Sequence, residues 1–415
     1  MTLLRDATFR RFWAGQTVSL LGDQISLFAV PLTAVLVLHA DATQMGLLTA
    51  AGLLPSLLFS LAAGSLVDRH GHRRRIMLAT DIGRALLMAT IPLSYALGRL
   101  GLAELYAVTF AVGTLNVLFA VAYGALFVSV VRPDDHVAGL SLLNGSRAMS
   151  FILGQSGAGL LVAVLSPPGA IVVDAVTFLV SAFALARIHP AEPPTSTDAG
   201  RGHLMGGVRF IVGSPIVRPA LAATATVNYF VLAFNAIMIL YATTALHVRP
   251  AVLGLVLGAG AVGGLLASAA TRRVSGRIGI GPTFVLGCVL FPAPLALVPL
   301  AGGPHNVVLA CLFASEFGAG AGVMLLDISF GAIFVGVIPD ELRSRVSGAY
   351  QSVNYGIRPL GALTGGFLGS AIGLRPTLAL SVAGAVTCAL WLVRSPIPHL
   401  RELAPAVDED ALPVA

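Results

Sequence analysis

The feature that most constrains this chain is a series of long apolar runs that follow one another along most of its length. Each run has about 20 residues or more, which is the length an α-helix needs to cross the hydrocarbon core of a bilayer. Only 11% of the 415 residues are charged and 56% are hydrophobic. Because soluble domains carry about 25% charged residues, the chain has too few charges for a water-facing surface. It is therefore predicted to be an all-α polytopic membrane protein.

Twelve membrane spans are expected, in two sets of six that flank the longest polar stretch inside the chain. The first six lie near 12–38, 44–67, 76–98, 103–131, 138–165 and 169–188. The second six lie near 218–246, 251–271, 281–301, 306–336, 346–370 and 374–393. Pro, Gly and charged residues mark most of the breaks, as expected for loops.

The polar stretches divide the chain into four segments. An N-terminal six-helix bundle is expected at 1–188, a cytoplasmic linker at 189–217, a C-terminal six-helix bundle at 218–393 and a cytoplasmic tail at 394–415. Pro, Thr, Ser and Asp are frequent in residues 190–202, which is typical of a flexible linker. Residues 204–212 are expected to form a short interfacial helix.

The distribution of arginine predicts the orientation of the spans. With the N-terminus inside, nineteen arginines fall in inward loops and tails, and three fall in outward loops. Cytoplasmic loops carry such an excess of basic residues. We therefore expect a multi-pass protein of the cell (inner, cytoplasmic) membrane with both termini in the cytoplasm. The arginines at the cytoplasmic ends of the spans account for the net charge of +6. Nucleic acid is therefore not expected as a partner.

The composition excludes several classes of function. All 25 basic residues are arginine, so the chain lacks the lysine of a phosphate-binding loop and any Schiff-base lysine. ATP hydrolysis within this chain is therefore not expected. The three cysteines lie in apolar runs without C-x-x-C spacing, which predicts no disulfide framework and no metal site. Since no Ser/His/Asp pattern is evident either, we expect no enzyme, no cofactor and no catalytic residues.

The two halves of the chain resemble each other at an offset of about 207 residues. The sequence GALFVSVV at 124–131 recurs as GAIFVGVI at 331–338, and Pro133 and Pro339 follow the two copies. Internal repeats of six spans each are typical of secondary transporters. The repeat therefore predicts two pseudo-symmetric six-helix bundles and a transport function.

A charged loop after the second expected span carries the most specific motif of the chain. Residues 64–75 read GSLVDRHGHRRR. This loop resembles the signature of the major facilitator superfamily, G-x-L-x-D-R-x-G-R-R-R, with His72 in place of the first basic residue of the final run. Gly64 allows close helix contact, and Gly71 permits a tight reversal of the chain. Asp68 can form a charge cluster with the neighbouring arginines.

The resemblance implies that this loop clasps the opposite half of the protein and stabilises the outward-open state. Asp81 and Arg84 lie one turn apart on the third span and are expected to extend the charge cluster. The alternative, that the arginine run with Arg74 and Arg75 only anchors the orientation of the chain in the membrane, stays open. The residues expected to act in gating are Gly64, Asp68, Arg69, Gly71, Arg73, Asp81, Arg84 and, near the cytoplasmic end of the tenth span, Asp327.

Further motifs resemble the drug-exporter branch of this superfamily, which contains enterobactin and macrolide exporters. They are FRRFWAGQ at 9–16, LGDQ at 21–24, RVSG at 345–348 and NYGIRPLG at 354–361. The resemblance covers essentially the whole chain. Two features depart from the pattern of proton antiporters. The span 103–131 contains no arginine, and the fifth-span motif survives only as GQSGAG at 154–159.

Two acidic residues lie at mid-depth of their spans, where an isolated charge costs about 2.5–3.5 kcal/mol. Asp23 lies about 16 Å along the first span at 1.5 Å per residue, and Glu316 lies at a similar depth in the tenth. Arg147 and Arg358 are the expected opposite charges. We predict that Asp23 and Glu316 carry protons, and static ion pairs with these arginines are the alternative.

Polar residues repeat along single faces of three further spans, at intervals that place them on one side of a helix. In the family that the chain resembles, helices 1, 4, 7 and 10 line a central cavity, with 2, 5, 8 and 11 beside them. The cavity residues that follow are Asp23, Asn116, Tyr123, Arg147, Asn228, Asn235, Glu316, Tyr350, Asn354 and Arg358.

These features predict a secondary active exporter of an amphiphilic small molecule such as an antibiotic, a drug or a siderophore. The two bundles are expected to alternate access to a midplane site, driven by inward proton flow. The expected partners are this substrate, protons and the lipid bilayer, and the protein is expected to be a monomer. The alternatives are a transporter of lysophospholipid or another lipid with the same fold, and a non-transporting membrane sensor.

Overall fold

A computed structural model of the chain describes residues 3–189 and 204–401, apart from the side chains of residues 61, 65, 68, 70, 204–207 and 344. The described residues form helices joined by loops and contain no strand. The predicted all-α class is therefore confirmed. The predicted flexible linker at 190–202 and the end of the predicted tail, 402–415, lie outside the described residues.

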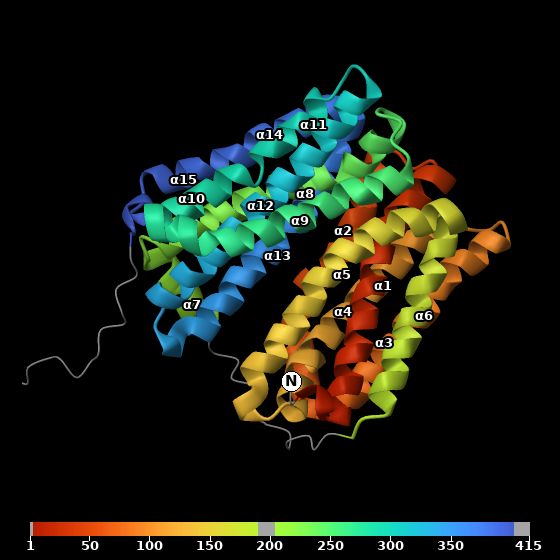
Figure 1. Cartoon of the computed structure of the whole chain (residues 1–415), viewed down its shortest axis with the longest axis horizontal. Coiled ribbons are helices and arrows are strands. Elements are labelled where there is room, and N and C mark those ends of the chain that lie inside the picture. Colours follow the sequence, from red (N-terminus) through yellow and green to blue (C-terminus); the bar gives the residue numbers. More distant parts are fainter. Residues whose placement is uncertain (1–2, 190–203, 402–415) are drawn as a thin grey trace, which may run out of the picture. The chain divides into compact units, whose positions relative to one another are not determined.

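Six long helices make up the first half of the chain (Figure 1). They are α1 (Ala7–Leu32), α2 (Ala42–His70), α3 (Arg73–Ala96), α4 (Leu102–Val130), α5 (His136–Leu165) and α6 (Pro167–Ala186). A π-helical segment, η2 (Thr33–Val37), prolongs α1. N-terminal capping residues mark the start of two of these helices, α1 and α2. Asp6 accepts a hydrogen bond from the Thr8 backbone nitrogen at 2.6 Å, and Asp41 forms a capping box with Gln44.

The second half begins with α7 (Leu204–Gly213), which confirms the short helix expected at 204–212. The long helices after it are α8 (Val217–Thr244), α9 (Pro250–Ile278), α12 (His305–Val337) and α13 (Asp340–Ala371). Shorter helical pieces form two of the expected spans. The ninth expected span consists of α10 (Ile280–Leu290), η4 (Ala293–Ala296) and α11 (Leu297–Leu300). The twelfth consists of α14 (Leu374–Val386), η5 (Thr387–Ala389) and α15 (Leu390–Val393). Pro292 and Pro294 explain the first division, because proline lacks the N–H of a helical hydrogen bond.

Eleven helical segments among the described residues are long and apolar enough to cross a membrane. They coincide with eleven of the twelve expected spans, with ends that differ by several residues. The other expected span, 346–370, lies in α13. This helix is 32 residues long, which is enough to cross a bilayer, but the polar residues along it lower its hydropathy. Short 3₁₀ turns stand at Leu3–Arg5, Pro133–Asp135 and Ile397–His399.

The described residues separate into two compact units. The first consists of the described part of Met1–Ala199 together with Leu232–Ala261 and Arg358–Leu378. The second consists of the described part of Gly200–Val231, Val262–Ile357 and Ala379–Ala415. The first unit therefore contains α1 to α6 and one part each of α8, α9 and α13. The division into bundles at 1–188 and 218–393 stays a prediction.

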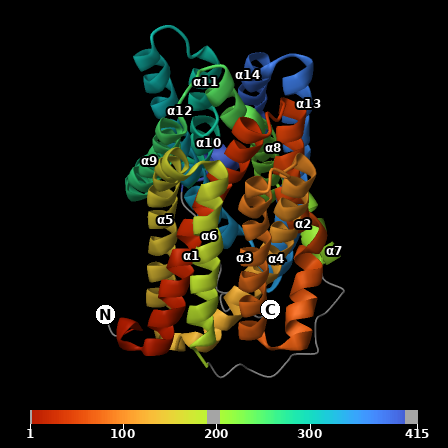
Figure 2. The ribbon, with the colours of Figure 1, turned by 90° about the vertical axis from the view of Figure 1, so that its right-hand side faces the viewer.

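Helix packing in the first unit is centred on α1 and α3. α1 packs against α5 and α6, α3 packs against α4 and α6, and α2 packs against α4. Figure 2 shows α1, α6 and α3 side by side. At the end where the chain begins, an apolar core forms around Phe9, Phe12, Met77, Leu126 and Phe127. The polar residues of the candidate site lie further along the same helices.

Two glycine contacts hold helices from the two halves of the chain together inside the first unit. A Cβ at Gly46 of α2 would lie 2.8 Å from the Cα of Gly366 on α13. A Cβ at Gly159 of α5 would lie 3.0 Å from the Cα of Gly254 on α9. Because small residues let helix backbones approach closely in membranes, a larger side chain at any of these positions would separate the helices.

The second unit is built on α10, which packs against α12. Its best-defined apolar core joins Ile211 of α7 to Val217 of α8, Ile338 and Val346. The short helix α7 therefore packs on other helices of its unit through a buried side chain. Its expected position at the membrane interface stays a prediction.

Candidate functional site

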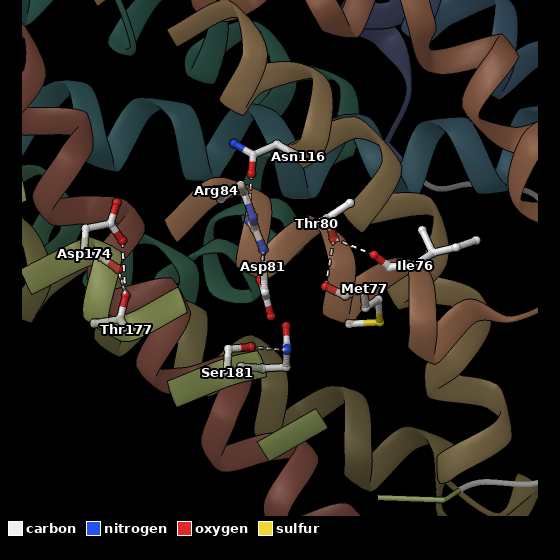
Figure 3. Close-up of polar contacts among 10 residues, drawn as sticks. Ile76, Met77, Thr80, Asp81, Arg84, Asn116, Asp174, Thr177 and Ser181 are labelled. Atoms are coloured by element: carbon white, nitrogen blue, oxygen red, sulfur yellow. Dashed lines mark hydrogen bonds and ion pairs between the residues drawn. The ribbon is translucent and has the colours of Figure 1, made fainter. Parts of the chain in front are cut away.

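A buried ion pair on α3 organises the interior of the first unit (Figure 3). Asp81 and Arg84 lie one turn apart, with 0% and 2% of their surface exposed, and their side chains form an ion pair. Arg84 Nη1 also donates to Asn116 Oδ1 of α4 at 2.6 Å. Asp81 lies about 12 Å along α3 at 1.5 Å per residue. The pair therefore lies inside the bundle, away from the charged loop at 64–75.

Two aromatic rings enclose the guanidinium of this pair. Arg84 Cζ lies 4.2 Å from the ring centroid of Phe119 on α4 and 4.3 Å from that of Phe178 on α6. Cation–π contacts of this kind become stronger when the cation is removed from water. Three helices thus hold Arg84 in place through one hydrogen-bonded ion pair, one amide and two rings.

A further acidic residue of this interior, Asp174 of α6, was not among the predicted site residues. It is 1% exposed. Ser26 of α1 donates a hydrogen bond to Asp174 Oδ2, and Thr177 Oγ1 lies 3.1 Å from Asp174 Oδ1. Asp174 lies within the expected span 169–188. The rule that an ionisable residue inside a span marks a functional site would therefore have found it.

Gly22 lets α1 approach α6 next to this carboxyl group. A Cβ at Gly22 would overlap Thr177 Oγ1 and Asp174 Oδ1, so any other residue would push the two helices apart. The next residue, Asp23, interacts electrostatically with Asp174, Asp81 and Arg84. Unlike the buried Asp81 and Asp174, Asp23 keeps a partly exposed surface. The interior is thus a cluster of three carboxyl groups and one guanidinium, which we call the α1/α3/α6 cluster.

The arginine that acts electrostatically on Asp23 lies on α3 and not on α5. Among the described residues no ion pair joins Asp23 to Arg147, and Arg84 is the arginine that acts on Asp23. Arg147 is exposed and acts on the Tyr123 hydroxyl of α4. The expected pairing of Asp23 with Arg147 is therefore not found. The proton-carrying role of Asp23 stays a prediction.

Polar contacts also tie α1 to α5. Trp13 Nε1 donates to Ser146 Oγ at 2.9 Å, and Thr17 Oγ1 donates to the same oxygen at 3.0 Å. Further along, Gln155 Nε2 donates to Gln24 Oε1 at 3.4 Å. Trp13 thus links α1 to α5 through a hydrogen bond of its indole nitrogen.

The second unit contains a smaller polar cluster that brings together three of the predicted cavity residues. Tyr350 of α13 donates through its hydroxyl to Thr224 Oγ1 of α8 at 2.8 Å. One turn along each helix, Asn228 Nδ2 donates to Asn354 Oδ1 at 2.9 Å. The Tyr350 ring stacks on Phe330 of α12 with 4.7 Å between centroids. Amides and a hydroxyl beside aromatic rings suit an amphiphilic ligand, and the cavity role stays a prediction.

The roles of four further predicted residues, Glu316, Arg358, Asn235 and Asp327, stay predictions. Glu316 of α12 is half-buried and belongs to the second unit, whereas Arg358 belongs to the first, so their pairing stays a prediction. Asn235 of α8 belongs to the first unit and is exposed. Asp327 of α12 is also exposed, and its gating role stays a prediction.

The charged loop confirms one of its two predicted glycine functions. Gly71 ends α2 with a φ of 67°, a conformation that favours glycine, and so forms the expected tight reversal. A Cβ at Gly64 would meet no described atom within 4 Å. The close helix contact expected at Gly64 is thus not found among the described residues and stays a prediction.

The arginines of the loop differ in their surroundings. Arg74 Nη1 donates to the backbone oxygen of Ile188 at 2.6 Å, which ties α3 to the end of α6. Arg69 is exposed and Arg73 is half-buried. The Asp68 side chain lies outside the described residues, so the predicted clasp stays a prediction.

Eleven apolar spans, one polar helix of spanning length and ionic groups buried inside a helical bundle define a polytopic membrane transporter. The family model of the Major Facilitator Superfamily matches residues 12–362 and 220–413. The chain therefore belongs to the major facilitator superfamily. Its fold class and the predicted family resemblance are confirmed.

Several known proteins are similar to the chain over nearly all of its length. It is 30% identical over 407 residues to the Multidrug efflux pump Tap of Mycobacterium tuberculosis, covering 94% of this chain and 93% of that protein. It is 26% identical over 389 residues to the uncharacterized MFS-type transporter YfiS of Bacillus subtilis, covering 92% and 90%. A crystal structure of a variant of the nucleoside transporter NupG has the same fold, with a TM-score of 0.74, 10% identity and coverage of 93% and 99%. The solved structure shows the fold, and the family model and the sequence relatives identify a transporter of the drug-exporter kind and not an enzyme.

Proposed function

We propose that the protein is a secondary active exporter of amphiphilic small molecules such as antibiotics, drugs or siderophores, driven by inward proton flow. The observation that carries the proposal is the 30% identity, over 94% of the chain, to a protein named as a multidrug efflux pump. The all-arginine composition agrees with it, because the chain lacks the lysine of a phosphate-binding loop. A gradient would then supply the energy that ATP does not.

The substrate would bind among polar groups that face an otherwise apolar interior. Tyr350, Asn228 and Asn354 support this proposal in the second unit, where hydroxyl and amide groups lie beside the Phe330 ring. Apolar walls with a few polar groups are the usual lining of small-molecule sites. Alternating access of two six-helix bundles would carry the molecule across, with the loop at 64–75 acting as a gate.

The coupling proposal rests on carboxyl groups inside the spans. Asp23 is partly exposed and lies in the α1/α3/α6 cluster, and Glu316 is half-buried on α12. A carboxyl group at such depth can pick up a proton on one side and release it on the other, because both charged and neutral forms are accessible. Asp23→Asn and Glu316→Gln are therefore expected to transport without response to a pH gradient.

We place the protein in the cell membrane with both termini in the cytoplasm, acting as a monomer. The arginine distribution, nineteen inward against three outward, supports the orientation. The linker 189–217 and the tail 394–415 would then also lie in the cytoplasm.

Proteoliposomes with an imposed pH gradient test the proposal. The purified protein would be reconstituted and offered ethidium, a macrolide, a ferric siderophore and a lysophospholipid in turn. Movement of ethidium or the macrolide that follows the gradient and stops with a protonophore is the expected result. Movement of the lysophospholipid alone would indicate a lipid transporter. If none of the four moves with or without the gradient, the exporter proposal is wrong.

A further inference from the structure

The α1/α3/α6 cluster holds more carboxyl groups than its cation can neutralise. Asp23, Asp81 and Asp174 face one guanidinium, that of Arg84. The charged groups that act on Asp174 from the helices packed against it are Asp23 of α1 and Arg84 of α3. With all four ionised, two negative charges would stay uncompensated in an apolar interior, which is costly. The cluster must therefore hold protons.

The ion pair on α3 leaves Asp23 and Asp174 without an ion-pair partner among the described residues. Arg84 is committed to Asp81, to Asn116 and to the rings of Phe119 and Phe178. What remains beside Asp174 is the Ser26 hydroxyl, the Thr177 hydroxyl and the like charge of Asp23. Two neighbouring carboxyl groups in one site do not both ionise readily.

The hydroxyl of Thr177 indicates which form of Asp174 this site fits. A hydroxyl has one proton to donate and lone pairs with which to accept. Thr177 Oγ1 lies 2.8 Å from the Asp174 backbone oxygen and 3.1 Å from Asp174 Oδ1. Thr177 donates toward both oxygens, so its single proton is shared with the nearer backbone oxygen. The ionised form of Asp174 therefore receives one full hydrogen bond, from Ser26, and a shared one from Thr177, which is little compensation for a buried charge.

A second observation also points to protons as the ligand. Asp81 is 0% exposed, and its Oδ2 is buried without a hydrogen-bond partner among the described residues. A buried oxygen of this kind is costly unless something satisfies it. The cluster therefore offers a further buried acceptor close to the partly exposed Asp23.

We propose that Asp174 is a proton-binding residue of this transporter, held neutral between Ser26 and Thr177 and exchanging its proton with Asp23. Asp23 is the partly exposed member of the cluster, and Asp174 would store the proton inside the bundle. In the exchange the O–H bond of the Asp23 carboxyl group breaks and an O–H bond forms at Asp174, so one proton moves and no other reactant takes part. The proposal rests on the proposed proton antiport and names a residue of its coupling site.

Infrared titration of the protein in membranes tests the site with protons alone. Protonated carboxyl groups absorb separately from ionised ones, so a pH titration reports each group that changes. Asp174→Asn should remove one carboxyl signal from this titration. The matched control is Glu104→Gln, which alters an acidic residue of α4 in the same unit, bound to Ser94 at 2.8 Å. The proposal would be overturned if Asp174→Asn titrated like the wild type, or if it differed from the wild type only in the way that Glu104→Gln does.

Two conservative variants distinguish a proton site from a structural hydrogen-bond network. Thr177→Val and Ser26→Ala each remove a hydroxyl that donates to the Asp174 carboxyl group. Each variant should therefore raise the proton affinity of the site, by up to about tenfold, the worth of one hydrogen bond. Ser26→Ala should raise it more, because Thr177 also donates to a backbone oxygen. A fall in proton affinity, or no shift in either variant, would contradict the hydrogen bonds assigned to Asp174.

Transport measurements separate failure of this site from failure of the proposed function. In proteoliposomes, Asp174→Asn should still exchange ethidium down its gradient but should lose the response to an imposed pH gradient. If transport by the wild type and by Asp174→Asn responds equally to the pH gradient, the proposed antiport stands and the assignment of Asp174 as a proton-binding residue is wrong. If the wild type does not respond, the antiport proposal fails, and the infrared titration still decides whether Asp174 binds a proton. If adding sodium ions at constant pH removed the Asp174 signal from the infrared titration, the site would bind sodium and the proposal would also be overturned.

Discussion

At the scale of single residues, Arg84 is the centre of the first unit. It is 2% exposed and is held by Asp81, Asn116 and two aromatic rings from three different helices. Removing one member of a buried ion pair leaves the other charge without compensation, which costs about 3–5 kcal/mol. The stability of this bundle should therefore depend on the pair as a unit.

Double-mutant analysis checks this dependence. Asp81→Asn and Arg84→Gln should each lower the thermal unfolding temperature in detergent markedly, and the double variant should lose less than the sum of the two, because neither charge is then left alone. The exposed Arg99→Gln serves as the control and should change little. Additive losses in the double variant would show that the ion pair is not what stabilises the bundle.

The Tyr350 hydroxyl provides a smaller test in the second unit. Tyr350→Phe keeps the ring on Phe330 but removes the hydrogen bond to Thr224 Oγ1 at 2.8 Å. The expected loss is about 1 kcal/mol of unfolding free energy, measured by unfolding in detergent. The exposed Tyr95→Phe should have no effect. A loss in the control as large as that in Tyr350→Phe would contradict the assigned bond.

Sequence reasoning identified several of these residues but not their partners. Helical spacing placed Tyr350 and Asn354 on one face, and the structure joins Asn354 to Asn228. It paired Asp23 with Arg147 because both lie within spans, yet helix packing brings Arg84 to Asp23 instead. Spacing within one helix follows from the sequence, whereas the choice of neighbouring helix depends on packing that no local pattern contains.

At the scale of elements, glycine positions decide which helices touch. The Gly46–Gly366 contact joins α2 to α13, and beside it the hydroxyls of Thr43 and Ser370 lie 2.8 Å apart. Both contacts belong to the first unit. Close approach of this kind tolerates no added side chain, since overpacking typically costs about 1–3 kcal/mol.

Oxidative crosslinking tests this contact directly. Thr43→Cys combined with Ser370→Cys should form a crosslink in high yield, because the two hydroxyl oxygens they replace are in contact. Adding Gly366→Val should lower the yield several-fold by separating the helices. Gly331→Val is the control, since a Cβ there would meet no described atom within 4 Å. Equal yields with the two valine variants would contradict the contact.

The membrane-spanning helices were predicted correctly where a long apolar run marks them in the sequence. Eleven spans were found within several residues of their ends because hydrophobic length alone determines them. The divisions at Pro292 and within 374–393 were not foreseen, since a span remains apolar whether or not its helix is continuous. Sequence patterns also did not indicate that parts of α8, α9 and α13 group with the first half.

At the scale of the whole molecule, orientation follows from charge. Nineteen inward arginines against three outward ones predict cytoplasmic termini. Alkaline phosphatase, which is active only outside the cytoplasm, should therefore be inactive when fused after Arg394 and active when fused within residues 97–101. Activity of the fusion after Arg394 would contradict the orientation, and the second fusion controls for enzyme that is merely unfolded.

The central claim is that substrate and protons move in opposite directions through one protein. The most direct measurement is proton movement driven by substrate alone, in proteoliposomes that enclose a pH-sensitive dye and start with equal pH on both sides. Adding an ethidium gradient should change the internal pH in the direction opposite to ethidium flow, and Asp23→Asn should abolish the change while ethidium still crosses. Ethidium flow through the wild type without any change of internal pH would contradict the account.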